Sequence, residues 1–321
     1  MAEVVELQDL QSGYVELVRH VRDTGRVAAP RGLKVRELRN VTVTVAEPLL
    51  GVPVGVGRRL NMAIGAAETA SLIGGISSAA LMIDVAHTFG NFTNGDRLLG
   101  AYGPRLFSML PDVVRKLSED SESRQAIAVV WRENEHRISE NKDVPCTVSL
   151  SWSVRDGKLD ATTHMRSNDV WLGVPYDFWM FTRLQMTLAW ALGLELGTYT
   201  HVVDNLHVYD KDVSKTHNLY VPVNFDRLEE KLPPAPIPDV PDPWAAVNRW
   251  AWAVGESANV VNGLAVANAT PQVLFYENLL SKHADGVTKR MCGGCRYVVP
   301  LRDFGVNGVD EVCGECRNKL G

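Results

Sequence analysis

The sequence predicts a mixed α+β fold, and three patterns support this prediction. Residues 147–154 and 159–164 alternate polar and apolar side chains on either side of the turn signal Arg155-Asp156-Gly157, which is typical of a β-hairpin. Residues 176–194 form a long apolar run rich in Leu, Met, Phe and Trp, which indicates a buried helix. Residues 201–209 predict a further strand. Strands and a buried helix within one stretch of chain favour the α+β class.

The bulk properties exclude several kinds of protein. A length of 321 residues is enough for a catalytic core with an appendage, and a net charge of -5 argues against a protein that coats nucleic acid non-specifically. The N-terminus lacks the pattern of a signal peptide, so we expect a cytoplasmic protein. Residues 63–83 are long enough to be weighed as a membrane span, but they contain Glu68 and are dominated by Ala, Gly and Ser. We expect a buried helix there, broken near Gly74-Gly75, and no membrane contact.

The chain divides into three zones. Residues 1–230 contain every motif of catalytic type and form the expected catalytic domain. Residues 231–288 begin with a proline-rich connector, which favours an extended path, and continue as an expected helical extension. Residues 289–321 contain paired cysteines.

The cysteine spacing predicts a zinc ribbon at the C-terminus. Four of the five cysteines form two CxxC pairs with seventeen residues between them, and these four are Cys292, Cys295, Cys313 and Cys316. Two such pairs supply four thiolates to a tetrahedral Zn²⁺, which would provide most of the folding energy of so small a module. A slight excess of basic residues in this zone leaves contact with nucleic acid as an alternative, but we favour a structural role.

The fifth cysteine, Cys146, stands apart from the other four. A single buried cysteine is usually inert, so the residue alone predicts little. Residues 166–177, RSNDVWLGVPYD, place an arginine, a serine and two aspartates between a predicted strand and a predicted helix. Polar side chains this dense beside core elements indicate a functional site.

Three stretches together resemble the thymidylate synthase family, which includes the deoxycytidylate and deoxyuridylate hydroxymethylases. They are PC at 145–146, MRSNDVWLGVPYD at 165–177 and DNLHVYD at 204–210, in the order and at the spacing of the family. Weaker similarity covers roughly residues 31–224. The resemblance implies a large mixed sheet with helices, assembled as a homodimer with two active sites.

The resemblance assigns the attack on the pyrimidine to Cys146, which would add to C6 as a thiolate and make C5 nucleophilic. Arg166 would hold this thiolate ionised and, with Ser167, bind the nucleotide phosphate. Arg31 would add a phosphate contact, and Arg124 would reach the phosphate site of the partner subunit. A second family arginine is replaced here by Gln125, which removes one charge from the expected phosphate clamp.

Further roles follow from the same resemblance. His207 and Tyr209 lie on one face of a strand and would bind the deoxyribose 3′-hydroxyl. Glu68 would order water at the base and assist proton transfer, and Tyr102 would lie near the nucleophile. The expected co-substrate is 5,10-methylenetetrahydrofolate, with contacts from Asp169, Gly173 and Tyr176.

Asp177 bears on the choice of base. Relatives specific for uridylate have asparagine at this position, whereas a carboxyl group can accept from the exocyclic amine of cytosine and, if protonated, donate to N3. An ionised carboxylate facing uracil O4 would pair two acceptors, which a buried site disfavours. The interpretation is therefore dCMP as substrate, with dUMP as the alternative.

The product depends on whether hydride or water reaches the methylene group on the ring. Methylating relatives exclude water with a tryptophan-bearing stretch and a closing tail, whereas this chain has no tryptophan before Trp131 and ends in a cysteine-rich module. Hydroxymethylation is favoured over methylation, and a bacteriophage origin is expected. Two other classes stay open: an inactive relative that binds nucleotides, and a zinc-ribbon protein that binds nucleic acid.

Overall fold

A computed structural model describes residues 3–48, 57–58, 60–75, 77, 79–93, 95, 97–133, 135, 143–220, 289–291 and 298–300. In residues 3–220 the strands form one sheet in the order β1-β3-β8-β6-β5-β4, with β2 paired to β3 and β7 paired to β8. The bounds are β1 Glu3–Leu7, β2 Arg26–Ala28, β3 Val35–Val45, β4 Ile127–Val129, β5 Thr147–Arg155, β6 Lys158–Met165, β7 Asn168–Asp169 and β8 Glu195–Tyr209.

The sheet is mixed, and its long central strand is β8. This strand pairs antiparallel with β3 and parallel with β6 and β7. The hairpin of β5 and β6 turns at Asp156 and Gly157, which both adopt positive φ as a tight two-residue turn requires. Two distant stretches of sequence, before β5 and after β6, therefore meet beside the centre of the sheet.

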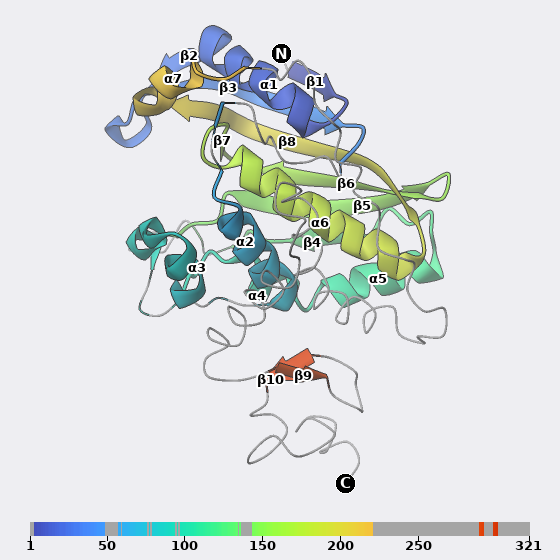
Figure 1. Ribbon diagram of the computed structural model, residues 1–321. Coiled ribbons are helices and arrows are strands. Elements are labelled where there is room, and N and C mark those ends of the chain that lie inside the picture. The colour runs from blue at the N-terminus through green and yellow to red at the C-terminus, as the bar shows by residue number, and fades with distance from the viewer. Residues whose placement is uncertain are drawn as a thin grey trace, which may run out of the picture.

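Helices cover the sheet, and α6 is the most deeply buried of those described (Figure 1). The helical bounds are α1 Leu10–Thr24, η1 Pro30–Gly32, α2 Met62–Gly74, α3 Ala79–Val85, η2 His87–Phe92, α4 Tyr102–Leu106, α5 Leu110–Glu119, α6 Val174–Leu192 and α7 Asp210–Thr216. Phe178, Phe181 and Leu184 of α6 are buried in the main core, whereas Tyr176 and Asp177 in its first turn remain partly accessible. The first turn of α6 can therefore contribute to a site while the rest of the helix anchors it.

These elements confirm the α+β class and most of the expected boundaries. The segment 63–83 forms two helices, α2 and α3, and Gly75 between them has a φ of +65°, where a Cβ would lie 2.9 Å from Phe107 Cδ2. No helix within the described ranges is long and apolar enough to cross a membrane. The strand expected at residues 201–209 begins earlier, at Glu195, because Gly193 at a φ of +68° ends the helical path and β8 then pairs directly with β6.

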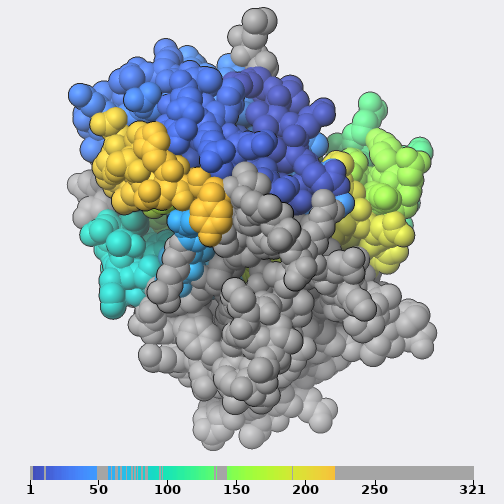
Figure 2. All heavy atoms as spheres, turned by 45° about the horizontal axis from the view of Figure 1, so that its top comes forward, coloured from blue at the N-terminus to red at the C-terminus, as the bar shows by residue number. Residues whose placement is uncertain are grey.

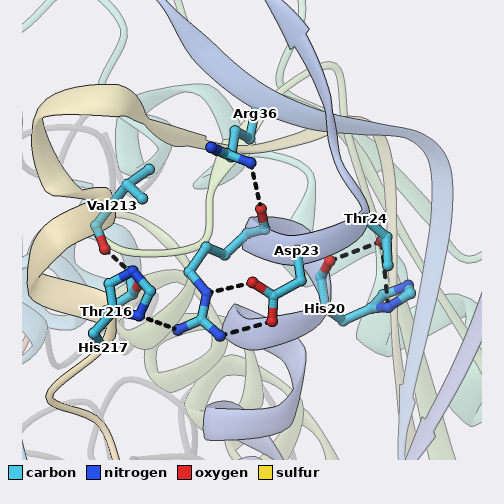
Figure 3. Close-up of polar contacts among 8 residues, drawn as sticks. His20, Asp23, Thr24, Arg36, Val213, Thr216 and His217 are labelled. Carbon is cyan, nitrogen blue, oxygen red and sulfur yellow. Dashed lines mark hydrogen bonds and ion pairs between the residues drawn. The ribbon is translucent and has the colours of Figure 1, made fainter.

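The end of β8 is fixed by contacts between α1, β3 and α7. Figure 2 shows the segment that contains α7 packed against the N-terminal part of the chain. Arg22 on α1 hydrogen-bonds to both carboxylate oxygens of Asp23, its Nη1 lies 3.4 Å from His217 Nδ1, and its carbonyl accepts from Arg36 of β3 (Figure 3). Because α7 directly follows Tyr209, this network holds the strand end that carries the expected sugar-binding residues.

Several predictions fall outside the described residues. These are the connector and helical extension at 231–288 and the four paired cysteines. The described strands β9 Lys289–Met291 and β10 Val298–Pro300 pair antiparallel, and the first CxxC pair lies between them in the sequence. The zinc ribbon and the boundaries of all three zones remain predictions.

Candidate active site

The hairpin of β5 and β6 brings Cys146 and Arg166 together. Thr147 pairs with Met165 across the hairpin, and the backbone N–H of Arg166 donates to the carbonyl of Cys146 at 2.9 Å. The Arg166 guanidinium donates to the carbonyls of Pro145 and Val144 at 2.9 and 3.1 Å, and its Nη2 lies 3.7 Å from Cys146 Sγ. These contacts fix the arginine beside the sulfur.

Two opposing effects act on the Cys146 thiol. Burial raises the pKa of the thiol above its ordinary value, and this effect exceeds the lowering by Arg166. Asp177 and Asp143 raise the pKa further, while Arg31 lowers it. Arg166 therefore acts in the expected direction, but it does not by itself keep the thiol ionised in the ligand-free protein. The expectation from the sequence considered only the charge of Arg166 and left out burial, which disfavours a charged sulfur.

Three side chains lie at the junction of β7 and β8. Asp169 pairs with His207 in the parallel β7–β8 register, and Val170 N donates to the His207 carbonyl at 2.7 Å. Ser167 Oγ lies 3.5 Å from His207 Nδ1, and the His207 and Tyr209 rings meet edge to face with centroids 5.1 Å apart. The expected phosphate and sugar ligands Ser167, His207 and Tyr209 thus form one group.

The two remaining expected phosphate ligands are exposed arginines. Arg31 in η1 has φ 53° and ψ 28°, a left-handed conformation that is costly for a residue other than glycine and is found preferentially at functional sites. Its effect on the Cys146 pKa places its charge within electrostatic range of the sulfur. Arg124 lies just before β4, and no described contact connects it to the Cys146 group.

Two carboxyl groups and a phenol near Cys146 interact electrostatically. Burial raises the pKa of Glu68 to about 8, with a further contribution from the negative charge of Asp177. Burial also raises the pKa of Asp177 to about 7, against a lowering by a hydrogen bond from Asn168. The pKa of Tyr102 is raised by burial and by the charges of Asp177 and Cys146. The structure therefore brings the three expected catalytic residues together with the expected base reader.

Asp169 has one satisfied and one unsatisfied carboxylate oxygen. Its Oδ1 accepts from Trp171 N at 2.8 Å and Leu172 N at 3.1 Å. Its Oδ2 is buried and has no hydrogen-bond partner within the described part of the chain. A buried acceptor without a partner is costly, so a ligand with an N–H donor would fit this position.

Gly173 and Tyr176 frame the same region. A Cβ at Gly173 would lie 2.3 Å from Asn168 Oδ1 and 3.0 Å from Asp177 Oδ2. These two oxygens therefore occupy the space that any side chain at this position would need. The Tyr176 hydroxyl accepts from Asn61 N at 3.1 Å, which connects α6 to the start of α2.

Sequence reasoning missed the residues behind Asp177. Asn168 and His201 are both buried, and Asn168 Nδ2 lies 2.9 Å from His201 Nε2. The sequence predicted no role for Trp131, yet the Arg166 guanidinium lies over its ring, with Cζ 5.7 Å from the ring centroid. The alternation along residues 201–209 could have shown that His201 shares a face with His207, but not that it reaches β7.

No group of three or more potential metal ligands occurs among the residues that the structure describes. The four paired cysteines were outside that search. The Cys146 site thus consists of a thiol, an arginine, carboxyl groups and hydroxyl groups.

The structure thus brings together a partly buried thiol beside a fixed arginine, two carboxyl groups with raised pKa values and a rim of arginine, serine and histidine, which are the kinds of group that covalent chemistry on an anionic ligand uses. The sequence profile of the thymidylate synthase family matches residues 13–232, which is more than half of the chain. The chain belongs to the thymidylate synthase family.

Two relatives show the range of this similarity. The chain is 29% identical over 253 residues to the deoxyuridylate hydroxymethyltransferase of Bacillus phage SP01, covering 70% of this chain and 66% of the relative. It is 27% identical over 244 residues to the "Putative thymidylate synthase" of Methanothermobacter thermautotrophicus, covering 72% of this chain and 99% of that protein. The chain thus spans just under two thirds of the length of the phage relative.

Proposed function

We propose that this protein transfers a one-carbon unit from 5,10-methylenetetrahydrofolate to C5 of dCMP and adds water, giving 5-hydroxymethyl-dCMP. The observation that carries the proposal is the position of Asp177, a carboxyl group that interacts electrostatically with both the Cys146 nucleophile and Glu68. Family membership and the phage hydroxymethyltransferase relative support the reaction class.

In the proposed reaction Cys146 adds to C6 of the pyrimidine. The C5–C6 π electrons shift towards C5, which then carries the nucleophilic pair. Arg166, 3.7 Å from Sγ, stabilises the thiolate at the moment of attack, and its Nη1 has no hydrogen-bond partner among the described residues and so remains available to a phosphate oxygen. C5 then bonds to the methylene carbon of the folate, loses its proton and expels tetrahydrofolate, which leaves an exocyclic methylene group on the ring. Water adds to this methylene group, and the electron pair that returns to C5 expels the sulfur from C6.

Glu68 suits the proton transfers of this reaction. A pKa of about 8 leaves it mostly protonated at neutral pH, so it can donate to the ring or to water and take the proton back. Tyr102 lies within electrostatic range of the sulfur and of both carboxyl groups, where its neutral hydroxyl can pass a proton between them.

The folate supplies the carbon that becomes attached to C5. The unpartnered Oδ2 of Asp169 is the group of this chain best suited to accept from an N–H of the pterin. Gly173 and Tyr176 stand beside it at the head of α6 and would complete that contact surface.

A second candidate substrate is dUMP, and a neutral Asp177 is compatible with it. Burial raises the pKa of Asp177 to about 7, so both its neutral and its ionised forms are accessible near neutral pH. A neutral carboxyl group can donate to uracil O4 and accept from N3–H. The phage relative is named for deoxyuridylate. The neutral form also complements cytosine, by donating to N3 and accepting from the exocyclic amine, whereas the ionised form would oppose uracil O4, so dCMP stays the first candidate.

The assembly completes the proposal. We infer a homodimer in which Arg124, exposed in the isolated chain, reaches the phosphate of the partner subunit. The C-terminal cysteines bind one structural Zn²⁺, and the protein acts in the cytoplasm, in that of the host if a phage encodes it. Retention of Cys146, Arg166 and His207 in one site argues against an inactive nucleotide binder.

The test is release of tritium from dCMP and from dUMP labelled at C5, in the presence of 5,10-methylenetetrahydrofolate, with mass analysis of the product. We expect release from dCMP and a product that has gained one carbon, two hydrogens and one oxygen. A product that has gained only CH₂ would replace hydroxymethylation with methylation. Asp177→Asn should shift the preference towards dUMP, and an unchanged preference would remove Asp177 as the base reader.

A further inference from the structure

Arg58 connects helix α1 to the turn that precedes α6. Its Nη1 donates to the Tyr14 hydroxyl of α1 at 2.6 Å and also to the carbonyl oxygen of Trp171 in that turn. Its Cζ lies 4.1 Å from the centroid of the Trp171 ring. Tyr14 is fully buried, and Trp171 is 8% exposed. Arg58 is therefore bound to a core tyrosine on one side and to both the backbone and the ring of Trp171 on the other.

The peptide group between Trp171 and Leu172 is held at both ends. Its C=O accepts from Arg58, and its N–H, which belongs to Leu172, donates to Asp169 Oδ1 at 3.1 Å. Because a trans peptide group is planar and its C=O and N–H point in opposite directions, these two contacts fix the plane between Arg58 and Asp169. Loss of Arg58 would release one end of this plane.

The same turn sets the orientation of the Asp169 carboxyl group. Trp171 N donates to Oδ1 at 2.8 Å, so both backbone contacts end on one oxygen. The other oxygen, Oδ2, is buried and has no hydrogen-bond partner among the residues that the structure describes. An acceptor that is already held in place binds a donor without the entropy cost of ordering it. The turn thus presents Oδ2 before any ligand arrives.

The backbone beside Arg58 is also held in place. Gly57 has a φ of +83°, and a Cβ there would lie 2.4 Å from the Asn218 carbonyl oxygen. Further along, the backbone N–H of Asn61 donates to the Tyr176 hydroxyl at 3.1 Å. Asn61 directly precedes α2, which packs beside α6 (Figure 1). Arg58 therefore reaches the turn from a stretch of chain that is itself bound to the head of α6.

We propose that Arg58 is a positioning residue for the folate. By holding the peptide group between Trp171 and Leu172, it keeps the Asp169 carboxyl group in the orientation that offers Oδ2 to an N–H of the pterin. The inference rests on the proposed role of Asp169 as the pterin contact, and it adds that Arg58 acts through Asp169. Within the described part of the chain, Arg58 makes no hydrogen bond to a residue expected to bind the nucleotide, so nucleotide affinity should not depend on it.

The first measurement needs no ligand. Hydrogen exchange of the amides of residues 170–173 in the full-length protein reports how firmly the turn is held. Arg58→Met keeps a side chain of similar length but removes both Nη1 contacts, and exchange of the Leu172 amide should become about 5- to 10-fold faster, the effect of one net hydrogen bond. The matched control is Arg155→Met, which also removes a donor to a backbone carbonyl but at the far end of β5, and it should leave this exchange unchanged.

The second measurement separates the folate from the nucleotide. The Kd for tetrahydrofolate in the presence of saturating dCMP should rise about 10-fold in Arg58→Met, whereas the Kd for dCMP alone should stay the same. Tyr14→Phe removes one of the two groups that hold Arg58, and it should raise the Kd for tetrahydrofolate in the same direction by a smaller factor. Because Tyr14 is fully buried, its effect cannot come from contact with the folate. Tyr14→Phe also serves as the test if Arg58→Met does not fold.

A double-mutant cycle with Asp169→Asn shows whether Arg58 acts through Asp169. Asparagine replaces Oδ2 by an NH₂ group that cannot accept, so in this background Arg58→Met should weaken tetrahydrofolate binding by no more than about twofold further. A further loss as large as in the single variant would mean that Arg58 contacts the folate directly, and it would overturn the inference. Unchanged exchange or an unchanged Kd for tetrahydrofolate in folded Arg58→Met, or in Tyr14→Phe if that variant replaces it, would overturn it too. Absence of turnover by the unaltered protein with either nucleotide would instead overturn the proposed function.

Discussion

The contact between Arg166 and Cys146 allows a quantitative prediction for Arg166→Gln. The Nη2–Sγ separation is 3.7 Å. At that distance a full charge pair is worth about 1 kcal/mol in water and about 4 kcal/mol at an effective dielectric of about 20. These limits correspond to about one to three pKa units for the thiol. Because Arg166 is only partly buried, we expect the lower part of this range, a rise of about one to two units.

The rate of alkylation by iodoacetamide at neutral pH measures this change, followed on the peptide that contains Cys146. A rise of one to two pKa units lowers the thiolate fraction about 10- to 100-fold. Thiolates of higher pKa are intrinsically more reactive, which offsets nearly half of the change on a logarithmic scale. The alkylation rate should therefore fall about 3- to 15-fold in Arg166→Gln.

Arg155→Gln is the matched control, because Arg155 lies at the far end of β5 and its Nη1 donates only to the adjacent carbonyl of Val154 among the described residues. Its alkylation rate should equal that of the unaltered protein. If Arg166→Gln also left the rate unchanged, or raised it, the arginine would not stabilise the thiolate.

Three further predictions concern packing and metal. Gly173→Ala places a Cβ 2.3 Å from Asn168 Oδ1, so one of the two groups must move, and the free energy of unfolding measured in urea should fall by about 1–3 kcal/mol. An unchanged midpoint of the urea transition would show that the space beside Gly173 can hold a methyl group. Glu135→Gln leaves the buried charge of Arg105 without its partner and should cost about 3–5 kcal/mol in the same assay, whereas a loss below about 1 kcal/mol would mean that water reaches the pair. Metal analysis of the unaltered protein should find one Zn²⁺ per chain, and Cys295→Ser should lose this Zn²⁺ but retain turnover. Loss of turnover in a Cys295→Ser variant that still forms a folded dimer would contradict a purely structural ribbon.

The elements with strong local patterns were predictable from the sequence. The hairpin of β5 and β6 and the helix α6 lie within two residues of their expected bounds, because alternation and the apolar run are properties of short windows. The start of β8 was missed by six residues, because residues 195–200 are defined by pairing with β6 and not by their own alternation. Parallel pairing of β6 with β8 is a tertiary property that no local window contains.

Only those site residues that belong to the recognised motifs could be predicted from the sequence. Resemblance selected Cys146, Arg166 and Asp177, and the structure brings them within electrostatic range of each other. The net shift in the pKa of the Cys146 thiol was not predictable from the sequence. Burial raises this pKa more than Arg166 lowers it, and the extent of burial depends on the packing around the thiol, which no motif contains. Asn168 and His201 lie 33 positions apart and no motif joins them, so their contact needed the β7–β8 register.

The central claim is that Cys146 adds to C6 of the pyrimidine, and a covalent adduct tests it most directly. A dCMP analogue with fluorine at C5 cannot lose a proton there, so the adduct formed with 5,10-methylenetetrahydrofolate should persist and be found by mass spectrometry on the peptide that contains Cys146. Cys146→Ser should form no adduct and release no tritium. An adduct on another residue, or tritium release by Cys146→Ser at the rate of the unaltered protein, would contradict the mechanism.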